Sequence, residues 1–162
     1  PIYLDQDTTI MDGTILENVL LGQKCTNERL LAVSNATGVD EVVKMQPHNW
    51  GTEISKGKNL SRGQEQRVCL SRCLVKNADI YLLDEATSNI DVVDEERIMK
   101  ALIGEGGLLE KKTVLISTHK LNMINYVDEV IYIKDRKVYQ GSHEQLLESL
   151  QSYNAFINGK VK

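Results

Sequence analysis

Long apolar segments are absent from this 162-residue sequence. Its apolar runs are short, such as Ile80–Leu83, and none approaches the roughly 18–20 residues that a membrane-spanning helix needs. Positive charge is not in excess either, because the formal net charge is -4 at pH 7. The sequence therefore lacks the basic patches typical of nucleic-acid-binding proteins, and we expect no nucleic-acid partner.

Cysteine is also scarce, with three residues and no C-x-x-C pair. Cys69 and Cys73 stand four positions apart, a spacing at which two helical side chains can share a metal. We instead expect both to be small buried apolar residues, in reducing, cytosolic surroundings. The sequence shows no signal-peptide pattern and opens at Pro1 without a methionine, so we expect it to be part of a longer protein.

The composition is otherwise ordinary for a globular domain, with 41% hydrophobic and 26% charged residues. The first part of the chain is predicted to be mostly helical. Thr14–Glu17 is a capping box that opens a short helix ending at Gly22. Asn27 is expected to cap a second helix and Asp40 to begin a third, before a loop over Gln46–Lys58.

The hydrophobic period changes further along the chain. Asp79–Leu83 and Thr113–Ser117 are short, continuously apolar segments, typical of strands buried in a parallel sheet. Between them a helix is predicted over Val92–Ile103, with Asp91 as its N-cap and Gly104 as its stop. This alternation of strands and helices indicates an α/β fold.

The last part of the chain is predicted to contain a pair of strands and a helix. Val130–Ile133 and Lys137–Tyr139 are expected to pair around a turn at Asp135–Arg136. Ser142–Gln145 has the capping-box pattern and opens the final helix.

Acidic residues directly follow the first of the buried strands. Asp84 and Glu85 come after Ile80–Leu83, and ligands of open α/β sheets bind beyond the carboxyl ends of the strands. One carboxylate at such a place can hold Mg²⁺ through water, and a second can orient or deprotonate an attacking water. The alternative is a plain strand-to-turn junction with solvated acids.

His119 follows the second buried strand in the same way. A histidine there can contact a γ-phosphate or relay a proton, and the alternative is a histidine that is merely hydrogen-bonded at a strand end. His48 and His143 lie in polar contexts and are predicted to be surface residues.

Ser61–Gln64 is a further capping box and begins a helix. Free N–H groups and the helix dipole favour anions at a helix start, and Gly63 allows a phosphate to approach the backbone. The alternative is a well-capped helix without a ligand.

Taken in order, these segments resemble the ATP-binding cassette (ABC) family, over essentially the whole chain. The matching segments are Tyr3–Gln6 (Q-loop), Leu60–Gln64 (signature), Ile80–Glu85 (Walker B and catalytic glutamate), Ser88–Asp91 (D-loop) and Ser117–His119 (switch histidine). The resemblance implies the α/β fold of P-loop NTPases, a RecA-like parallel sheet core, here partial, with an inserted helical subdomain. Residues 1–6 would end a core strand and form the Q-loop, 7–77 the helical subdomain, and 78–162 the C-terminal part of the ATP-binding core.

The resemblance also implies roles for single residues in an ATPase that couples hydrolysis to transmembrane transport. Glu85, His119 and Gln6 would be catalytic, and Asp84 with Gln6 would hold Mg²⁺. Contacts to ATP would come from Leu60, Ser61, Arg62, Gly63, Gln64 and Asp91, with the nucleotide held by a second cassette in a head-to-tail sandwich. The other implied partners are the transporter's transmembrane domains, which would place the chain at the cytoplasmic face of a membrane.

Finer features resemble subfamily C, the multidrug-resistance-associated group. Gly13–Gly22 resembles the segment after that group's Q-loop, and Thr52–Gly57 resembles its pre-signature loop. Asn77–Asp84 and Gly107–Thr113 resemble its first cassette. Glu85–Ser88 instead resembles second cassettes and single-cassette transporters.

Two departures from the family pattern bear on function. The sequence contains no G-x-x-x-x-G-K-[ST] P-loop, which we expect upstream of Gln6; the glycines at Gly51 and Gly57 have the wrong spacing. Trp50 does not replace the missing adenine-stacking aromatic and is predicted to be a packing residue. Arg62 stands where the family usually has glycine and is expected to point to solvent, the alternative being a phosphate contact.

Two other functions remain open from the sequence. One is a soluble ABC-type ATPase, against which Thr14–Gly22 and Gln64–Arg67 look like transporter segments. The other is a non-catalytic docking module, against which the presence of both Glu85 and His119 argues.

Overall fold

The computed structural model describes residues 1–6 and 9–159. The chain divides into two compact units, Pro1–His119 and Lys120–Lys162, which are described separately here. Among the described residues, none of the helices combines the length and apolar character needed to cross a bilayer.

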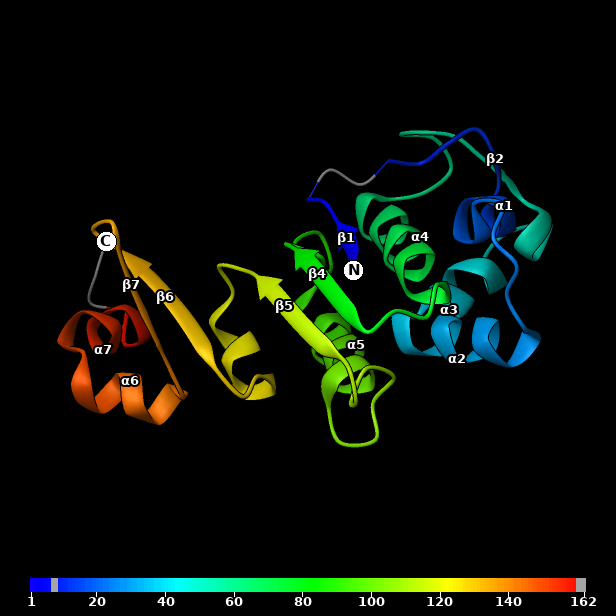
Figure 1. The fold of residues 1–162 in the computed structure, drawn as a ribbon. Helices are drawn as coiled ribbons and strands as arrows, with labels where there is room; N and C mark the ends of the chain where they lie inside the picture. The colour runs from blue at the N-terminus through cyan, green and yellow to red at the C-terminus, as the bar shows by residue number, and fades with distance from the viewer. Residues whose placement is uncertain (7–8, 160–162) are drawn as a thin grey trace. The chain divides into compact units, whose positions relative to one another are not determined.

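A parallel sheet forms the centre of the first unit (Figure 1). Its strands are β1 (Ile2–Leu4), β4 (Ile80–Asp84) and β5 (Thr113–Ser117), in the order β1-β4-β5. Both pairs are parallel, so the carboxyl ends of all three strands lie at one edge of the sheet. The predicted α/β class with a parallel sheet is confirmed.

One face of this sheet is buried. Tyr81 and Leu83 of β4 are 0% and 2% exposed, and they belong to a hydrophobic cluster with residues of α4 (Arg62–Val75) and α5 (Val92–Ile103). The sheet therefore packs against these two helices and fixes the helix starts relative to the strand ends.

The other face is more open than predicted. Tyr3, Leu82 and Leu115 form a row across the three strands, and Tyr3 and Leu115 are 59% and 53% exposed. The prediction of a fully buried strand at Thr113–Ser117 is wrong, because its residues alternate between exposed and half-buried. The reason is that only the face carrying Val114 and Ile116 packs against the hydrophobic cluster.

The helical segment, within the predicted residues 7–77, contains α1 (Ile15–Leu20), α2 (Asn27–Thr37), α3 (Val39–Lys44), the 3-10 turn η1 (Asn49–Gly51) and α4. The predicted capping boxes at Thr14 and Ser61 are both formed. Trp50 of η1 packs against the hydrophobic cluster, as predicted.

Two predicted helix starts in this segment are wrong. Thr26, not Asn27, caps α2, because its hydroxyl accepts a hydrogen bond from Arg29 N. Gly38, in the left-handed conformation with φ 70°, ends α2 and begins α3, so Asp40 already lies inside the helix.

The predicted loop over Gln46–Lys58 also contains regular structure. Besides η1 it holds β3 (Glu53–Ile54), which pairs antiparallel with β2 (Gly13–Thr14). Two-residue strands carry too little alternation to be read from sequence.

The helix α5 has the predicted bounds. The Asp91 side chain accepts a hydrogen bond from Asp94 N and caps it. Gly104 ends the helix as expected, but with extended backbone (φ −68°, ψ 173°) instead of the left-handed conformation of many C-caps.

The second unit contains η2 (Leu121–Tyr126), β6 (Val130–Lys134), β7 (Lys137–Gly141), α6 (His143–Ser149) and α7 (Gln151–Ile157). The strands β6 and β7 are antiparallel, as predicted. Asp135 and Arg136 both have positive φ, of 50° and 61°, which matches the twist of a tight hairpin. The predicted final helix is two helices, because Leu150 between them is extended.

Aromatic rings pack the hairpin of the second unit against its helices. The centroid of the Tyr132 ring lies 5.2 Å from the ring centroid of Tyr153 and 5.7 Å from the ring centroid of Phe156. His143, predicted to be a surface residue, is half-buried, and its Nδ1 lies 2.9 Å from Tyr153 Oη. His48 is exposed, as predicted.

The predicted division of the chain at residues 6/7 and 77/78 remains a prediction. The second of these boundaries falls inside the first unit, between α4 and β4, where helices and sheet share one hydrophobic cluster. The helical segment and the sheet are thus packed together throughout the part that positions the site.

Candidate functional site

Three side chains meet at the carboxyl edge of the parallel sheet. Gln6 follows β1, Glu85 follows β4 and His119 follows β5. Gln6 Nε2 donates a hydrogen bond of 2.8 Å to Glu85 Oε2, and His119 Nδ1 lies 3.1 Å from Glu85 Oε1. The Glu85 carboxylate is thus held between an amide and an imidazole that come from the two neighbouring strands.

The backbone of Glu85 has an uncommon conformation. Its φ is 45°, in the left-handed region that residues with a side chain seldom adopt. Glu85 N donates to Ser117 O at 2.9 Å, so the last residue of β5 helps to fix this turn. Backbone strain of this kind is found where the surrounding structure determines the position of a functional side chain.

Asp84, the last residue of β4, is half-buried next to Tyr3 of β1. Tyr3 Oη donates to Asp84 Oδ2 at 3.2 Å. Partial desolvation, the charge of Asp5 and the hydrogen bond to Asp84 raise the pKa of Tyr3 above its ordinary value. Sequence reasoning did not assign a role to Tyr3, which lies in the middle of β1.

Asp84 and Gln6, at the ends of neighbouring strands, carry oxygen donors. The Asp84 carboxylate and the amide oxygen of Gln6 are the donor types that Mg²⁺ takes, and this ion keeps several waters instead of requiring a full protein cage. Within residues 1–6 and 9–159 there is no cluster of three or more His, Cys, Asp and Glu side chains suited to a metal. The residues present therefore fit a sparsely ligated magnesium ion and offer no dedicated transition-metal site.

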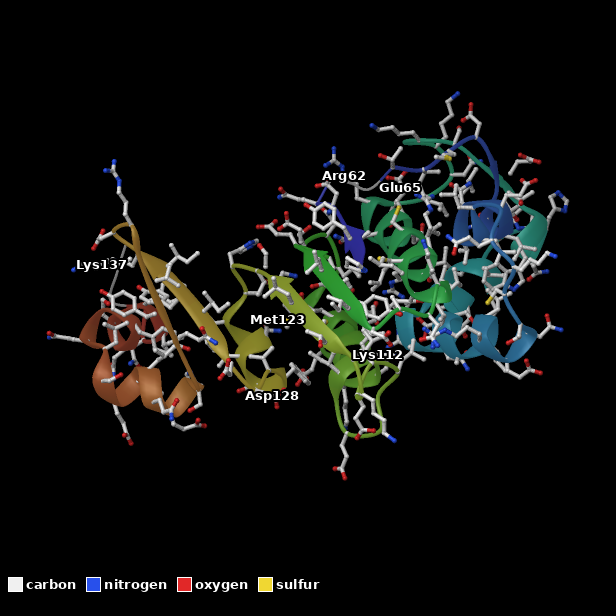
Figure 2. The ribbon with its side chains drawn as sticks, in the orientation of Figure 1. Arg62, Glu65, Lys112, Met123, Asp128 and Lys137 are labelled. Atoms are coloured by element: carbon white, nitrogen blue, oxygen red, sulfur yellow. The ribbon has the colours of Figure 1, made fainter. Side chains whose placement is uncertain are left out.

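A second group of predicted residues surrounds the start of α4. The Ser61 hydroxyl accepts from Gln64 N at 3.3 Å, and the Gln64 side chain accepts from Ser61 N at 2.9 Å. Leu60 is half-buried against the hydrophobic cluster, and Arg62 on the first turn of α4 is exposed, as expected (Figure 2). A hollow beside this turn is lined by Ser61, Gly63, Gln64, Arg67, Asn89, Ile90 and Asp91.

Gly63 packs closely against the loop that follows Glu85. A Cβ atom at this position would lie 2.8 Å from Asn89 O, which is too close for any side chain without a shift of the backbone. Asp91 is at the end of the same loop, and the hydrogen bond from Asp94 N lowers the pKa of its carboxyl. Asp91 is therefore charged at neutral pH at the rim of the hollow.

Gln66 is a site residue that sequence reasoning missed. Its side chain is buried and contacts the loop Glu85–Asn89 at three points, through Glu85 O, Ser88 Oγ and Asn89 N. The sequence offered no signal for it, because no pattern shows which helix residues bond to a distant loop.

A sequence profile described as "ABC transporter" matches residues 2–88, more than half of the chain. The chain belongs to the ABC transporter family. The matched range includes Gln6, Leu60–Gln64, Asp84 and Glu85.

Several ABC relatives align with nearly the whole chain. ABC transporter B family member 14 of Arabidopsis thaliana is 32% identical over 158 residues, which is 96% of this chain and 12% of that protein. The mesentericin-Y105 transport/processing ATP-binding protein MesD of Leuconostoc mesenteroides is 35% identical over 96% of this chain and 22% of that protein. The ABC transporter ATP-binding protein YknV of Bacillus subtilis is 37% identical over 96% and 26%. The chain thus spans between 12% and 26% of the length of these three relatives.

A network of charges joins the helices of this ABC chain. Arg67 of α4 forms ion pairs with Glu41 of α3, at 3.3 Å, and with Asp94 of α5. Arg97 of α5 pairs with the same two acids, at 2.8 and 3.2 Å. The Arg67 side chain is only 11% exposed, so the network fixes α4, which begins at the signature, relative to α5, which begins at Asp91.

Proposed function

We propose that this chain is part of the ATP-binding domain of an ABC transporter, in which ATP hydrolysis drives the movement of a substrate across a membrane. The supporting observation is the Glu85 carboxylate, which lies at the carboxyl edge of a parallel sheet between Gln6 and His119. Family membership and this geometry favour phosphoryl transfer to water over a purely structural role.

Glu85 is the residue that orients and deprotonates the attacking water in this proposal. A carboxylate within hydrogen-bond reach of a water is suited to act as a general base. In the same proposal His119 contacts the γ-phosphate. Gln6 reaches the site from the end of β1. Since both Gln6 and His119 now contact Glu85 directly, a bound water and phosphate would have to come between these side chains.

Asp84 and Gln6 would hold the magnesium ion of Mg-ATP. When bound, the ion neutralises charge that develops on the phosphate oxygens. Tyr3 keeps the Asp84 carboxylate oriented through its 3.2 Å hydrogen bond, which also lies at the carboxyl edge of the sheet.

The start of α4 would face a nucleotide bound by a second cassette. Ser61 and Gly63 would make the closest approach, with Leu60, Arg62, Gln64 and Asp91 around them. The 14-residue helix α4 directs its N-terminal N–H groups to this side, which favours an anion. The partners in this proposal are that second cassette, in a head-to-tail ATP sandwich, and transmembrane domains at the cytoplasmic face of a membrane.

The narrower family placement is part of the proposal. The segments Gly13–Gly22 and Thr52–Gly57 support subfamily C, the multidrug-resistance-associated group, whereas relatives named above carry B-family and bacteriocin-transport names. The general assignment to ABC transporters does not depend on this choice.

Residues 1–162 by themselves would bind ATP only weakly, because the sequence contains no P-loop motif. Two or three hydrogen bonds to phosphate, at about 1.5–3 kcal/mol each, less the cost of association, give about millimolar affinity. Titration calorimetry of the isolated chain tests this, and a micromolar dissociation constant would contradict it.

Replacement of the proposed base tests the function. In the full-length protein, Glu85→Gln should lower ATP turnover by about 10²–10⁴-fold and leave ATP binding intact, because only the proton acceptor is lost. Glu105→Gln, an exposed acid in the loop after α5, is the matched control and should retain activity. Turnover near the wild-type rate in Glu85→Gln would place the base elsewhere.

A further inference from the structure

Gln66 has an unusual position for a helix amide. It lies on the second turn of α4, and only 1% of the residue is exposed. Its Nε2 donates to Glu85 O at 3.0 Å and lies 3.2 Å from Ser88 Oγ, while its Oε1 accepts from Asn89 N at 2.8 Å. The donor and the acceptor of this buried amide thus both form hydrogen bonds, and both bind the same loop.

The loop Glu85–Asn89 is therefore held against α4 at two places. One is Gln66, and the other is Gly63, whose missing Cβ leaves room for Asn89 O. Gly63 and Gln66 are three positions apart, so they lie on the same face of the helix. The loop begins at the strained backbone of Glu85, whose carbonyl is one of the groups that Gln66 binds.

We infer that Gln66 is a positioning residue, which fixes the Glu85 carboxylate relative to the signature segment at the start of α4. The inference rests on the proposed function, in which Glu85 acts on the nucleotide of this cassette and Ser61 and Gly63 face the nucleotide of the other. Because one amide binds both ends of the loop, the residues that serve the two nucleotides move together. Gln66 itself touches neither nucleotide in this arrangement.

Two nearly isosteric variants of the full-length protein separate the contacts. Gln66→Glu keeps an acceptor for Asn89 N but cannot donate to Glu85 O when ionised, and Gln66→Met keeps the shape and loses every hydrogen bond. We expect kcat for ATP hydrolysis to fall about 10–100-fold in both, because small displacements of a reacting group have effects of that order. KM for ATP should stay within about twofold, since Gln66 holds the loop of the water-activating carboxylate and not the ATP.

Asn18→Asp is the matched control for the loss of a buried amide. Asn18 is also 1% exposed, and its Nδ2 donates to Met11 O and Thr14 O, away from the loop Glu85–Asn89. This variant should lose thermal stability and keep kcat within about twofold. Circular dichroism and binding of a non-hydrolysable ATP analogue report folding, and Gln66→Met decides the question if Gln66→Glu does not fold.

The outcomes are distinct for the inference and for the function on which it rests. A wild-type protein without ATPase activity, or an active Glu85→Gln, refutes the proposed function. If both behave as proposed, then a kcat near the wild-type value in folded Gln66 variants, or a rise in KM alone, overturns the inference. An equal loss of kcat in Asn18→Asp also overturns it, because the effect would then be one of general stability.

Discussion

Gln6 donates a hydrogen bond of 2.8 Å to the carboxylate of Glu85, which lies 79 positions away in the sequence. The contact exists because β1 and β4 are parallel neighbours and both residues follow the carboxyl ends of their strands. Gln6 is thus in direct contact with the carboxylate that is proposed to activate the attacking water.

Loss of the Gln6 side chain should raise the Mg²⁺ concentration that ATP hydrolysis requires. In the full-length protein, Gln6→Ala removes both a proposed magnesium ligand and the contact to Glu85, so turnover should fall about 10–100-fold. The Mg²⁺ concentration for half-maximal ATPase activity should rise, and a magnesium titration of the rate measures it. Gln151→Ala, in α7 of the second unit, is a control that should leave the titration unchanged.

A methyl group at Gly63 should disturb the loop that follows Glu85. The added Cβ of Gly63→Ala would stand 2.8 Å from Asn89 O, so α4 and the loop must move apart. We expect at least about a fivefold loss of ATPase turnover. Gly51→Ala, where a Cβ meets nothing within 4 Å, should stay within about twofold of wild type. Equal activities of the two variants would mean that this close contact has no role.

Removal of Arg67 should loosen the helical segment. Arg67→Met leaves Glu41 and Asp94 without their shared, nearly buried partner. Both acids are partly exposed, so the cost is roughly 1–2 kcal/mol, less than for a fully buried pair. Hydrogen exchange of the full-length protein should show faster exchange in α3 than in wild type.

The control for this variant is Lys44→Met, which breaks the pair with Asp40 on the surface of α3. The Lys44 side chain is 72% exposed, so solvent screens this pair and its loss should leave the stability nearly unchanged. Protection of α3 that is unchanged in Arg67→Met would show that the charge network does not stabilise this helix.

Thiol modification should distinguish the cysteines. Burial, and to a lesser degree the neighbouring Cys69, raises the pKa of Cys73 to about 12 from the model-compound value of 9.0. A raised pKa means less thiolate at pH 8, by about a thousandfold, and the thiolate is the reactive form. Iodoacetamide at pH 8 should therefore label half-buried Cys25 well before Cys73, as mass spectrometry will show.

Denatured protein should lose this difference, because all three thiols are then exposed. Labelling of native Cys73 at the rate of Cys25 would contradict the burial of α4 at this position.

Local signals in the sequence were sufficient for much of the fold. The capping boxes at Thr14, Ser61 and Ser142 are formed because their partners lie three residues away, so neighbouring chemistry determines them. Thr26 shows the limit of this reasoning, since it and Asn27 are both good caps and only the geometry of the turn selects one.

The meeting of Glu85 and His119 followed from one topological rule, that parallel strands present their carboxyl ends at a common edge, whereas Gln6 was expected there only from the resemblance to the ABC family. The burial of β5 did not follow, because it depends on which strands flank it and on what covers each face. Gln66 was missed for a related reason. Its partners lie 19 to 23 positions further on, and no local pattern shows what a glutamine in a helix binds.

The left-handed backbone at Glu85 affects how substitutions there should be interpreted. Glycine would relax this turn and valine would oppose it, so each changes the backbone as well as removing the acid. Activities from such a series would mix two causes, the lost carboxylate and a shifted chain. Only glutamine or aspartate at position 85, in variants whose backbone keeps the same φ, separates the chemical effect of the side chain from a shift of the backbone.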